Sequence, residues 1–173
     1  ISEIGQHPEH SQQIEPDVDA MLKSFDAMTE VDEVLELIAN GESKTVEFKE
    51  TYKLDIDKGV GSKDVELSVL KTIVAFLNSE GGKAIIGVRD NGEIAGIDLE
   101  LQRFHKGNTD RFLRHVKNAI KKRIGEDYYP FLDQRLVSIA DSLLLVFDCK
   151  PSDHECYLDG IDFYVRTTPA TDK

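Results

Sequence analysis

Three carboxylates and one lysine have the residue types of a phosphate-cleaving metal site. Glu42 and Glu47 lie five positions apart, Lys49 follows Glu47 by two, and Asp90 lies at the end of the apolar segment KAIIGV. Carboxylates that share Mg²⁺ or Mn²⁺, with a lysine to stabilise charge on the attacked phosphate, are the parts of a metal-dependent phosphodiesterase. An acid and a lysine two apart on a strand also form an ordinary surface ion pair of little energy. Both interpretations stay open, and the residues point to no other cofactor.

A row of basic residues is the second group with a chemical use. Within TDRFLRHVKNAIKKRI, residues 109–124, basic side chains recur at intervals of three, three and four, which places them on one side of a helix, opposite its apolar side chains. Such a row is either a solvated helix face or a surface that contacts phosphates, with His115 as a minor participant. The residues predicted to contact nucleic acid are Lys49, Lys71, Arg111, Arg114, Lys117, Lys121 and Arg166.

The glycine pair in NSEGG, residues 78–82, raises the question of a phosphate-binding loop. It lacks the GxxxxGK[ST] spacing of a Walker A loop. It also follows an expected helix and precedes an expected strand, whereas the glycines of a dinucleotide-binding fingerprint follow a strand and precede a helix. We therefore predict that this turn ends a helix, with glycine at positive φ, and begins a strand.

The elements that must position these residues follow from periodicity. VELSVLKTIVAFLN and residues 109–124 have the apolar spacing of helices, and TVEFKETYKL alternates as a strand does. Further strands are expected in KAIIGV, EIAGI, QRLVSIA and SLLLVFDCK, with a final hairpin around Asp159-Gly160 and a loop over residues 55–64. The predicted fold class is α+β: a mixed, mostly antiparallel sheet packed by two main helices, with an N-terminal helical extension.

Three segments are expected along the chain. Residues 1–16 read as a tail or linker, residues 17–40 as a helical extension and residues 41–173 as the main domain. The extension is predicted to form two helices, the second capped by Thr29 and ended by the Asn40-Gly41 pair. Its role would be to pack on the domain or to bind a partner. The polar N-terminal segment does not resemble a signal peptide, and we expect a domain excised from a larger protein.

The charge distribution limits the kind of partner. The formal net charge is −12, yet residues 43–125 carry +4 and the acidity lies in residues 1–42 and 126–173. A local basic face is therefore compatible with nucleic acid, whereas nonspecific coating of DNA is not expected. The longest apolar run, Leu143 to Phe147, is far shorter than a membrane span. Cys149 and Cys156 have no zinc-ligand spacing and are expected to be reduced thiols of a cytoplasmic protein.

Three blocks of the sequence resemble a known family. ESKTVEFKE, LKTIVAFLNSEGGKAIIGVRDNGEIAG and FYVRTTPAT are similar, in this order, to the Schlafen-type AlbA-like DNA-binding domain, over roughly residues 35–171. That domain occurs in bacterial proteins labelled as transcriptional regulators or as helicase-related ATP-binding proteins, and in animal Schlafens. The resemblance implies a nucleic-acid-binding α+β fold. The ATP-binding label belongs to full-length relatives.

The same resemblance bears on the carboxylates. Animal Schlafens that cut RNA use three, and Glu42 and Glu47 match the first two in spacing and context. The third falls at Arg89-Asp90, where arginine replaces a frequent acid and only Asp90 remains.

Three functions are therefore open. The first is a nucleic-acid-binding domain, for DNA or RNA, of a larger bacterial regulatory or defence protein, in contact with that protein's other domains. The second is a metal-dependent endoribonuclease that uses Glu42, Glu47 and Asp90 as ligands and Lys49 at the phosphate. The third is a protein-interaction or homo-oligomerisation domain that acts through residues 17–39.

Overall fold

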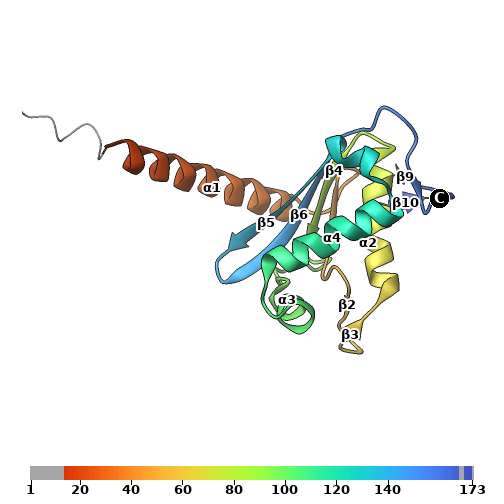
Figure 1. Cartoon of the computed structure of the whole chain (residues 1–173), viewed down its shortest axis with the longest axis horizontal. Coiled ribbons are helices and arrows are strands. Elements are labelled where there is room, and N and C mark those ends of the chain that lie inside the picture. Colours follow the sequence, from red (N-terminus) through yellow and green to blue (C-terminus); the bar gives the residue numbers. More distant parts are fainter. Residues whose placement is uncertain (1–13, 168–169, 173) are drawn as a thin grey trace, which may run out of the picture. The chain divides into compact units, whose positions relative to one another are not determined.

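The computed structural model describes residues 14–167 and 170–172 (Figure 1). The predicted tail, residues 1–16, lies almost entirely outside the described residues. The chain divides into two compact units, residues 1–36 and 37–173. No helix within the described ranges is both long enough and apolar enough to cross a membrane.

The first unit contains most of one continuous helix. Helix α1 spans Ile14–Asn40, so the prediction of two helices with a break at Thr29 is wrong. The Thr29 hydroxyl does not cap a second helix. It donates instead to the Phe25 carbonyl, one turn back, at 3.0 Å. The helix ends where predicted, because Gly41 has a φ of 79° and its N–H bonds to the Leu37 carbonyl at 3.2 Å.

A four-stranded sheet is the centre of the second unit. Its strands are β1 (Val46–Lys49), β4 (Gly82–Ile86), β5 (Leu132–Ile139) and β6 (Ser142–Cys149), in the order β1-β4-β6-β5. The β1–β4 pair is parallel, and the other two pairs are antiparallel. This confirms the predicted mixed, mostly antiparallel sheet of an α+β fold.

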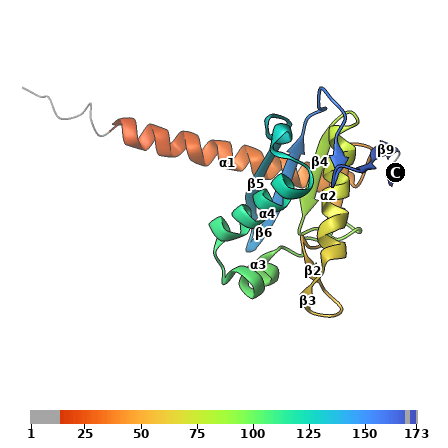
Figure 2. The same cartoon turned by 45° about the vertical axis from the view of Figure 1, so that its right-hand side comes forward.

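Two amphipathic helices cover one face of this sheet. They are α2 (Lys63–Leu77) and α4 (Thr109–Arg123), both at the positions that periodicity predicts (Figures 1 and 2). The side chain of Ser62 caps α2 by accepting from the Val65 N–H, and Asn108 caps α4 in the same way. Alternate residues of β4 and β6, among them Ala84 and Phe147, complete the core beneath the helices.

Several short elements were not predicted. Helix α3 (Asp98–His105) and the 3₁₀ helix η1 (Glu126–Phe131) flank α4 in the sequence. The expected loop at residues 55–64 contains part of a small ribbon, β2 (Leu54–Asp55) with β3 (Val60–Gly61). The expected strand EIAGI forms only one bridge, Val88 with Ile94. The final hairpin is present as β7 (Tyr157–Leu158) with β8 (Asp162–Phe163), followed by β9 (Val165–Thr167) and β10 (Ala170–Asp172).

The glycine pair is structural, as predicted. Gly81 has a φ of 79°, and a Cβ there would lie 2.4 Å from the Cys149 carbonyl oxygen. A Cβ on Gly82 would lie 2.5 Å from the Phe76 ring. Side chains at either position would push apart the end of α2 and the sheet, so the turn needs glycine for close packing.

The side chain that precedes this turn joins distant parts of the chain. The Asn78 amide donates to the carbonyls of Cys156 at 2.8 Å and Tyr164 at 2.9 Å, and its oxygen accepts from the Cys156 N–H at 2.8 Å. All three bonds reach the C-terminal segment, so one asparagine fixes that segment against the end of α2. Cys156 and Cys149 are both free and buried, and burial raises the pKa of Cys156 to about 12.

Candidate nucleic-acid interface

The predicted metal ligands are placed apart or already bonded. Glu42 is exposed, and one of its oxygens accepts from the Phe48 N–H at 2.8 Å, which fixes the entry to β1. Glu47 is bound by two cations: Lys49 Nζ at 2.5 Å and the Arg166 guanidinium at 2.9 Å. Both of its oxygens therefore have charged partners from the chain itself.

Asp90 lies exposed in the turn after β4, held by a bond from the Arg89 N–H to the Glu93 carbonyl at 2.9 Å. In the parallel register Glu47 is level with Ala84, six positions before Asp90. Within the described ranges, no group of three or more His, Cys, Asp or Glu side chains is arranged to hold a metal ion. The geometry thus does not fit Mg²⁺ or Mn²⁺ at the three carboxylates.

Arg166, which was expected to contact phosphates, lies inside the protein. Its side chain is fully buried and its guanidinium stacks on the Phe76 ring at 4.9 Å. Besides Glu47, its nitrogens donate to the carbonyls of Ser43 at 2.9 Å and Lys44 at 3.2 Å. A buried guanidinium with these partners is unavailable to a phosphate, so Arg166 joins β9 to the segment before β1.

The basic row on α4 is exposed but divided between two sides of the helix. Arg111 and Arg114 border a pocket on the side facing α3 and the β2 end. Lys117 lies 5.2 Å above the Tyr129 ring, and Lys121 pairs with Glu126 at 2.7 Å, both towards η1. Because a helix turns by about 100° per residue, Lys117 lies about 120° around the axis from Arg111, whereas Lys121 is nearly level with Arg114 around the axis and lies about two turns further along it.

Lys71 and Lys49, the other two predicted contacts, lie on different elements. Lys71, on α2, is 5.6 Å from the centre of the Tyr164 ring, and Lys49 is the partner of Glu47. Neither belongs to the side chains that border the pockets beside α4.

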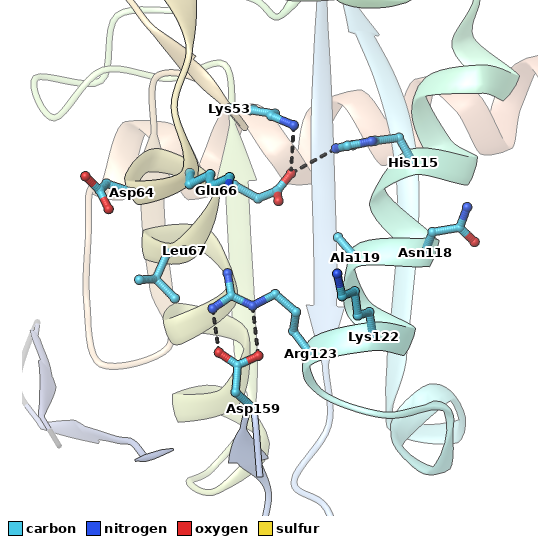
Figure 3. A pocket seen from close by; sticks show the side chains of 11 residues that line it. Lys53, Asp64, Glu66, Leu67, His115, Asn118, Ala119, Lys122, Arg123 and Asp159 are labelled. Atoms are coloured by element: carbon cyan, nitrogen blue, oxygen red, sulfur yellow. Dashed lines mark hydrogen bonds and ion pairs between the residues drawn. The ribbon is translucent and has the colours of Figure 1, made fainter. Parts of the chain in front are cut away.

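A groove of about 580 Å³ lies between the N-terminal half of α2 and α4 (Figure 3). Asp64, Glu66 and Leu67 reach it from α2, and His115, Asn118 and Lys122 from α4. Lys63 and Lys122 are exposed and make no ion pair with any residue that the structure describes. Lys53, which follows Tyr52 before β2, also lines this groove.

Two ion-pair networks fix the walls of the groove. Glu66 Oε2 lies 2.9 Å from His115 Nε2 and 4.0 Å from Lys53 Nζ. The hydrogen bond from His115 holds the pKa of Glu66 below its ordinary value. On the other side Arg123 forms a two-pronged pair with Asp159, with distances of 2.9 and 2.5 Å. These pairs set the positions of the side chains while the unpaired lysines remain available.

A second pocket of about 460 Å³ adjoins the groove. Lys53, His115 and Asn118 line both, so the two form one continuous depression along α4. Lys53 is held in place by its backbone, whose N–H donates to the buried carboxylate of Glu100 at 2.7 Å.

Sequence reasoning missed part of this surface. Lys53 and Lys63 belong to it, yet both lie in segments where the sequence shows no helical periodicity. The signal that was present is the excess of basic residues between positions 43 and 125.

The chain belongs to the family described as "Schlafen, AlbA_2", whose model matches residues 42–173. The family supports a nucleic-acid-related domain. The fold is similar to the crystal structure of the DIP2311 protein from Corynebacterium diphtheriae, with a TM-score of 0.57 and 16% identity over 84% of this chain. The chain spans only 29% of the length of that protein. Among curated proteins, none matches the chain.

Proposed function

We propose that this domain binds nucleic acid along the groove beside α4. The phosphates would lie against the basic side chains that border the groove. The observation that carries the proposal is a concave surface bordered by cations without carboxylate partners in the described residues: Arg111, Arg114, Lys63 and Lys122. Cations without an internal ion pair break no such pair when they contact a phosphate, and their binding releases counterions from the nucleic acid.

The remaining predicted contacts have internal partners. Lys49 and Arg166 are bound to Glu47, and Lys121 is bound to Glu126. Displacement of Lys49 or Arg166 by a phosphate would leave the largely buried Glu47 carboxylate without that partner, which opposes binding. The exposed Lys121–Glu126 pair is weak, and Lys121 is set aside because it lies towards η1, away from the groove. The proposal therefore rests on Arg111 and Arg114 within the predicted set, together with the lysines of the groove.

The test compares two double variants with the same change of charge. Arg111→Gln/Arg114→Gln removes two cations from the groove side, and Lys117→Gln/Lys121→Gln removes two from the η1 side of the same helix. Fluorescence anisotropy with labelled single- and double-stranded DNA and RNA, over a range of salt, gives affinity and salt slope. Two lost phosphate contacts reduce the slope by about 1.4 for single strands and about 1.8 for duplex DNA.

We expect this reduction for the arginine variant and little change for the lysine variant. An equal loss in both would show a general effect of net charge and would refute the groove. Circular dichroism confirms that each variant is folded.

The endoribonuclease prediction is tested in the same reactions with Mn²⁺ and with EDTA. Cleavage that needs the metal and is lost in Glu42→Gln, with folding intact, would make the chain an enzyme, although the described residues hold no group of three such side chains arranged for a metal. Binding without cleavage agrees with our proposal.

The proposal also includes the kind of protein in which this domain acts. A cytoplasmic regulatory or defence protein of bacteria, in which other domains act on the bound nucleic acid, suits a binding domain of this family. The exposed apolar residues of α1 offer that larger protein, or a second copy, a contact surface: Val18, Met21, Leu22, Phe25 and Met28. Light scattering of the whole chain measures whether it is an oligomer.

A further inference from the structure

The second pocket beside α4 contains basic side chains and no carboxylate. Its walls include Lys53, Phe104, His105, Arg111, Arg114 and Asn118, with His115 at the junction with the groove. The neighbouring groove, in contrast, contains Asp64, Glu66 and Asp159. In a chain with a net charge of −12, a concave site without an acid is a selective environment for an anion.

Two of the three permanent charges of this pocket have no ion pair among the described residues, and the third, Lys53, has one long ion pair. Arg111 and Arg114 are exposed and form no ion pair within the part of the chain that the structure describes. The nearest carboxylate recorded for Lys53 is that of Glu66, at 4.0 Å, a carboxylate that already has His115 at 2.9 Å. The Glu100 carboxylate fixes the backbone of Lys53 by a hydrogen bond, so the Lys53 side chain extends from an ordered Cα.

A buried histidine gives a second, independent indication. His105 is 93% buried and lines the pocket, and its Nδ1 has no hydrogen-bond partner among the described residues. Burial lowers the pKa of His105, and the nearby charges of His115, Arg111 and Lys53 lower it further. A buried ring nitrogen without a partner costs free energy unless something binds to it. An anion in the pocket would supply negative charge beside this ring, where the recorded neighbours are His115, Arg111 and Lys53.

Two further side chains suit a nucleotide. Phe104 is partly exposed and packs against the β2–β3 ribbon, where its ring lies within 3.6 Å of the position of a Cβ on Gly61. An aromatic ring beside a cationic site offers a stacking surface for a base. The exposed Asn118 amide, at the junction of pocket and groove, has donors and an acceptor for a base edge or a phosphate.

We propose that this pocket holds a terminal phosphate monoester of a nucleic-acid strand, whose following nucleotides continue into the groove between α2 and α4. The inference rests on the proposed function. A terminal monoester has a charge of about −1.5 to −2 near neutral pH, whereas each internal diester has −1, so three converging cations favour the end of a strand. Lys53, His115 and Asn118, which line both compartments, would contact the first linkage.

The test uses three oligonucleotides of one sequence: one with a 5′-phosphate, one with a 3′-phosphate and one with hydroxyls at both ends. Competition against a labelled strand gives their relative affinities for the whole chain. We expect one of the two phosphorylated strands to bind at least about tenfold more tightly than the strand with hydroxyl ends. Which one does so identifies the end that enters the pocket.

Two variants locate the effect. Arg114→Gln should reduce the preference for the phosphorylated strand to less than about threefold, and Lys117→Gln, on the η1 side, should leave it unchanged. His105→Gln is the second pocket variant and gives an independent check on the preference for the phosphorylated strand. Circular dichroism confirms that it is folded.

The outcomes separate the two proposals. Equal binding of all three strands overturns the terminal-phosphate inference and leaves the nucleic-acid-binding proposal standing. A preference that persists in both pocket variants also overturns the inference, because the phosphate then binds elsewhere. Failure of every strand to bind overturns both.

Discussion

Replacement of Arg166 by methionine should destabilise the protein far more than its distance from the groove suggests. The Arg166 side chain is fully buried, and Glu47 is 13% exposed. Methionine keeps an apolar contact with Phe76 but leaves Glu47 with Lys49 alone. It also removes the donor of the Lys44 carbonyl and one of the two donors of the Ser43 carbonyl. Loss of one partner of a buried ion pair costs about 3–5 kcal/mol. We use about 3 kcal/mol, because Ser43 and Lys44 are partly accessible to water.

This magnitude predicts a clear shift in thermal unfolding. For a domain of this size, 1 kcal/mol corresponds to about 2–4 °C in Tm, so Arg166→Met should lower Tm by about 6–12 °C. The assay is circular dichroism at neutral pH and fixed salt, with urea unfolding as a second measure. The matched control is Arg89→Met. Arg89 is likewise paired with carboxylates, Glu50 at 2.8 Å and Glu93 at 2.7 Å, but it is 44% exposed. Its loss should change Tm by no more than about 2 °C.

A double-mutant cycle with Glu47→Gln isolates the pair. The two substitutions should couple by about 1–3 kcal/mol, since each removes the same interaction. A fall of less than about 3 °C for Arg166→Met, or an equal fall for Arg89→Met, would refute the structural role of Arg166. It would also return Arg166 to the set of available phosphate contacts.

Two further predictions concern the turn after α2 and the wall of the groove. Gly81→Ala should lower Tm by several degrees more than Gly160→Ala. Both residues have positive φ, but a Cβ at Gly81 meets the Cys149 carbonyl, whereas a Cβ at Gly160 meets nothing within 4 Å. Equal shifts of Tm in thermal unfolding would contradict the packing argument. Because His115 holds the pKa of Glu66 below 4.5, the stability contributed by the Glu66 carboxylate is present above about pH 4.5 and lost as pH falls through the lower folded-state value. The difference in unfolding free energy between the wild type and Glu66→Gln should therefore shrink as pH falls below about 4.5, and a constant difference in urea titrations would count against the pair.

The parts of the fold that were predicted are those whose signal is local. Helix α4 is a clear case, because Phe112, Val116 and Ile120 repeat at helical spacing and are all buried. Helix α3 was missed because it has only eight residues and its buried positions are Glu100, Leu101 and His105, of which only one is apolar. No window of apolar periodicity could mark such a helix.

The candidate site was predicted less well, because its geometry depends on contacts between distant segments. The pocket joins Lys53, from the segment before β2, to His105 on α3 and to Arg111 on α4. Arg166 was expected to contact phosphates, but it lies in β9 and its charge is paired with Glu47, 119 positions away. The spacing of residues in the sequence describes a single helix or strand. It does not show which basic side chains form ion pairs with carboxylates from distant segments.

The bonds that fix the C-terminal segment also impose an order on synthesis at the ribosome. Asn78 reaches partners 78 and 86 positions later in the chain, and Glu47 waits for a guanidinium 119 positions later. While the chain is still growing, α2 and β1 can form and Glu47 already has Lys49 nearby. The Asn78 amide, however, has no partners until Cys156 and Tyr164 have emerged, and Glu47 lacks its second cation until Arg166 has emerged. Contacts of such long sequence separation are made last and slowly. The nascent domain therefore depends on its final strands for closure, and a ribosome that stalls before Arg166 holds a chain that is open to chaperones and proteases.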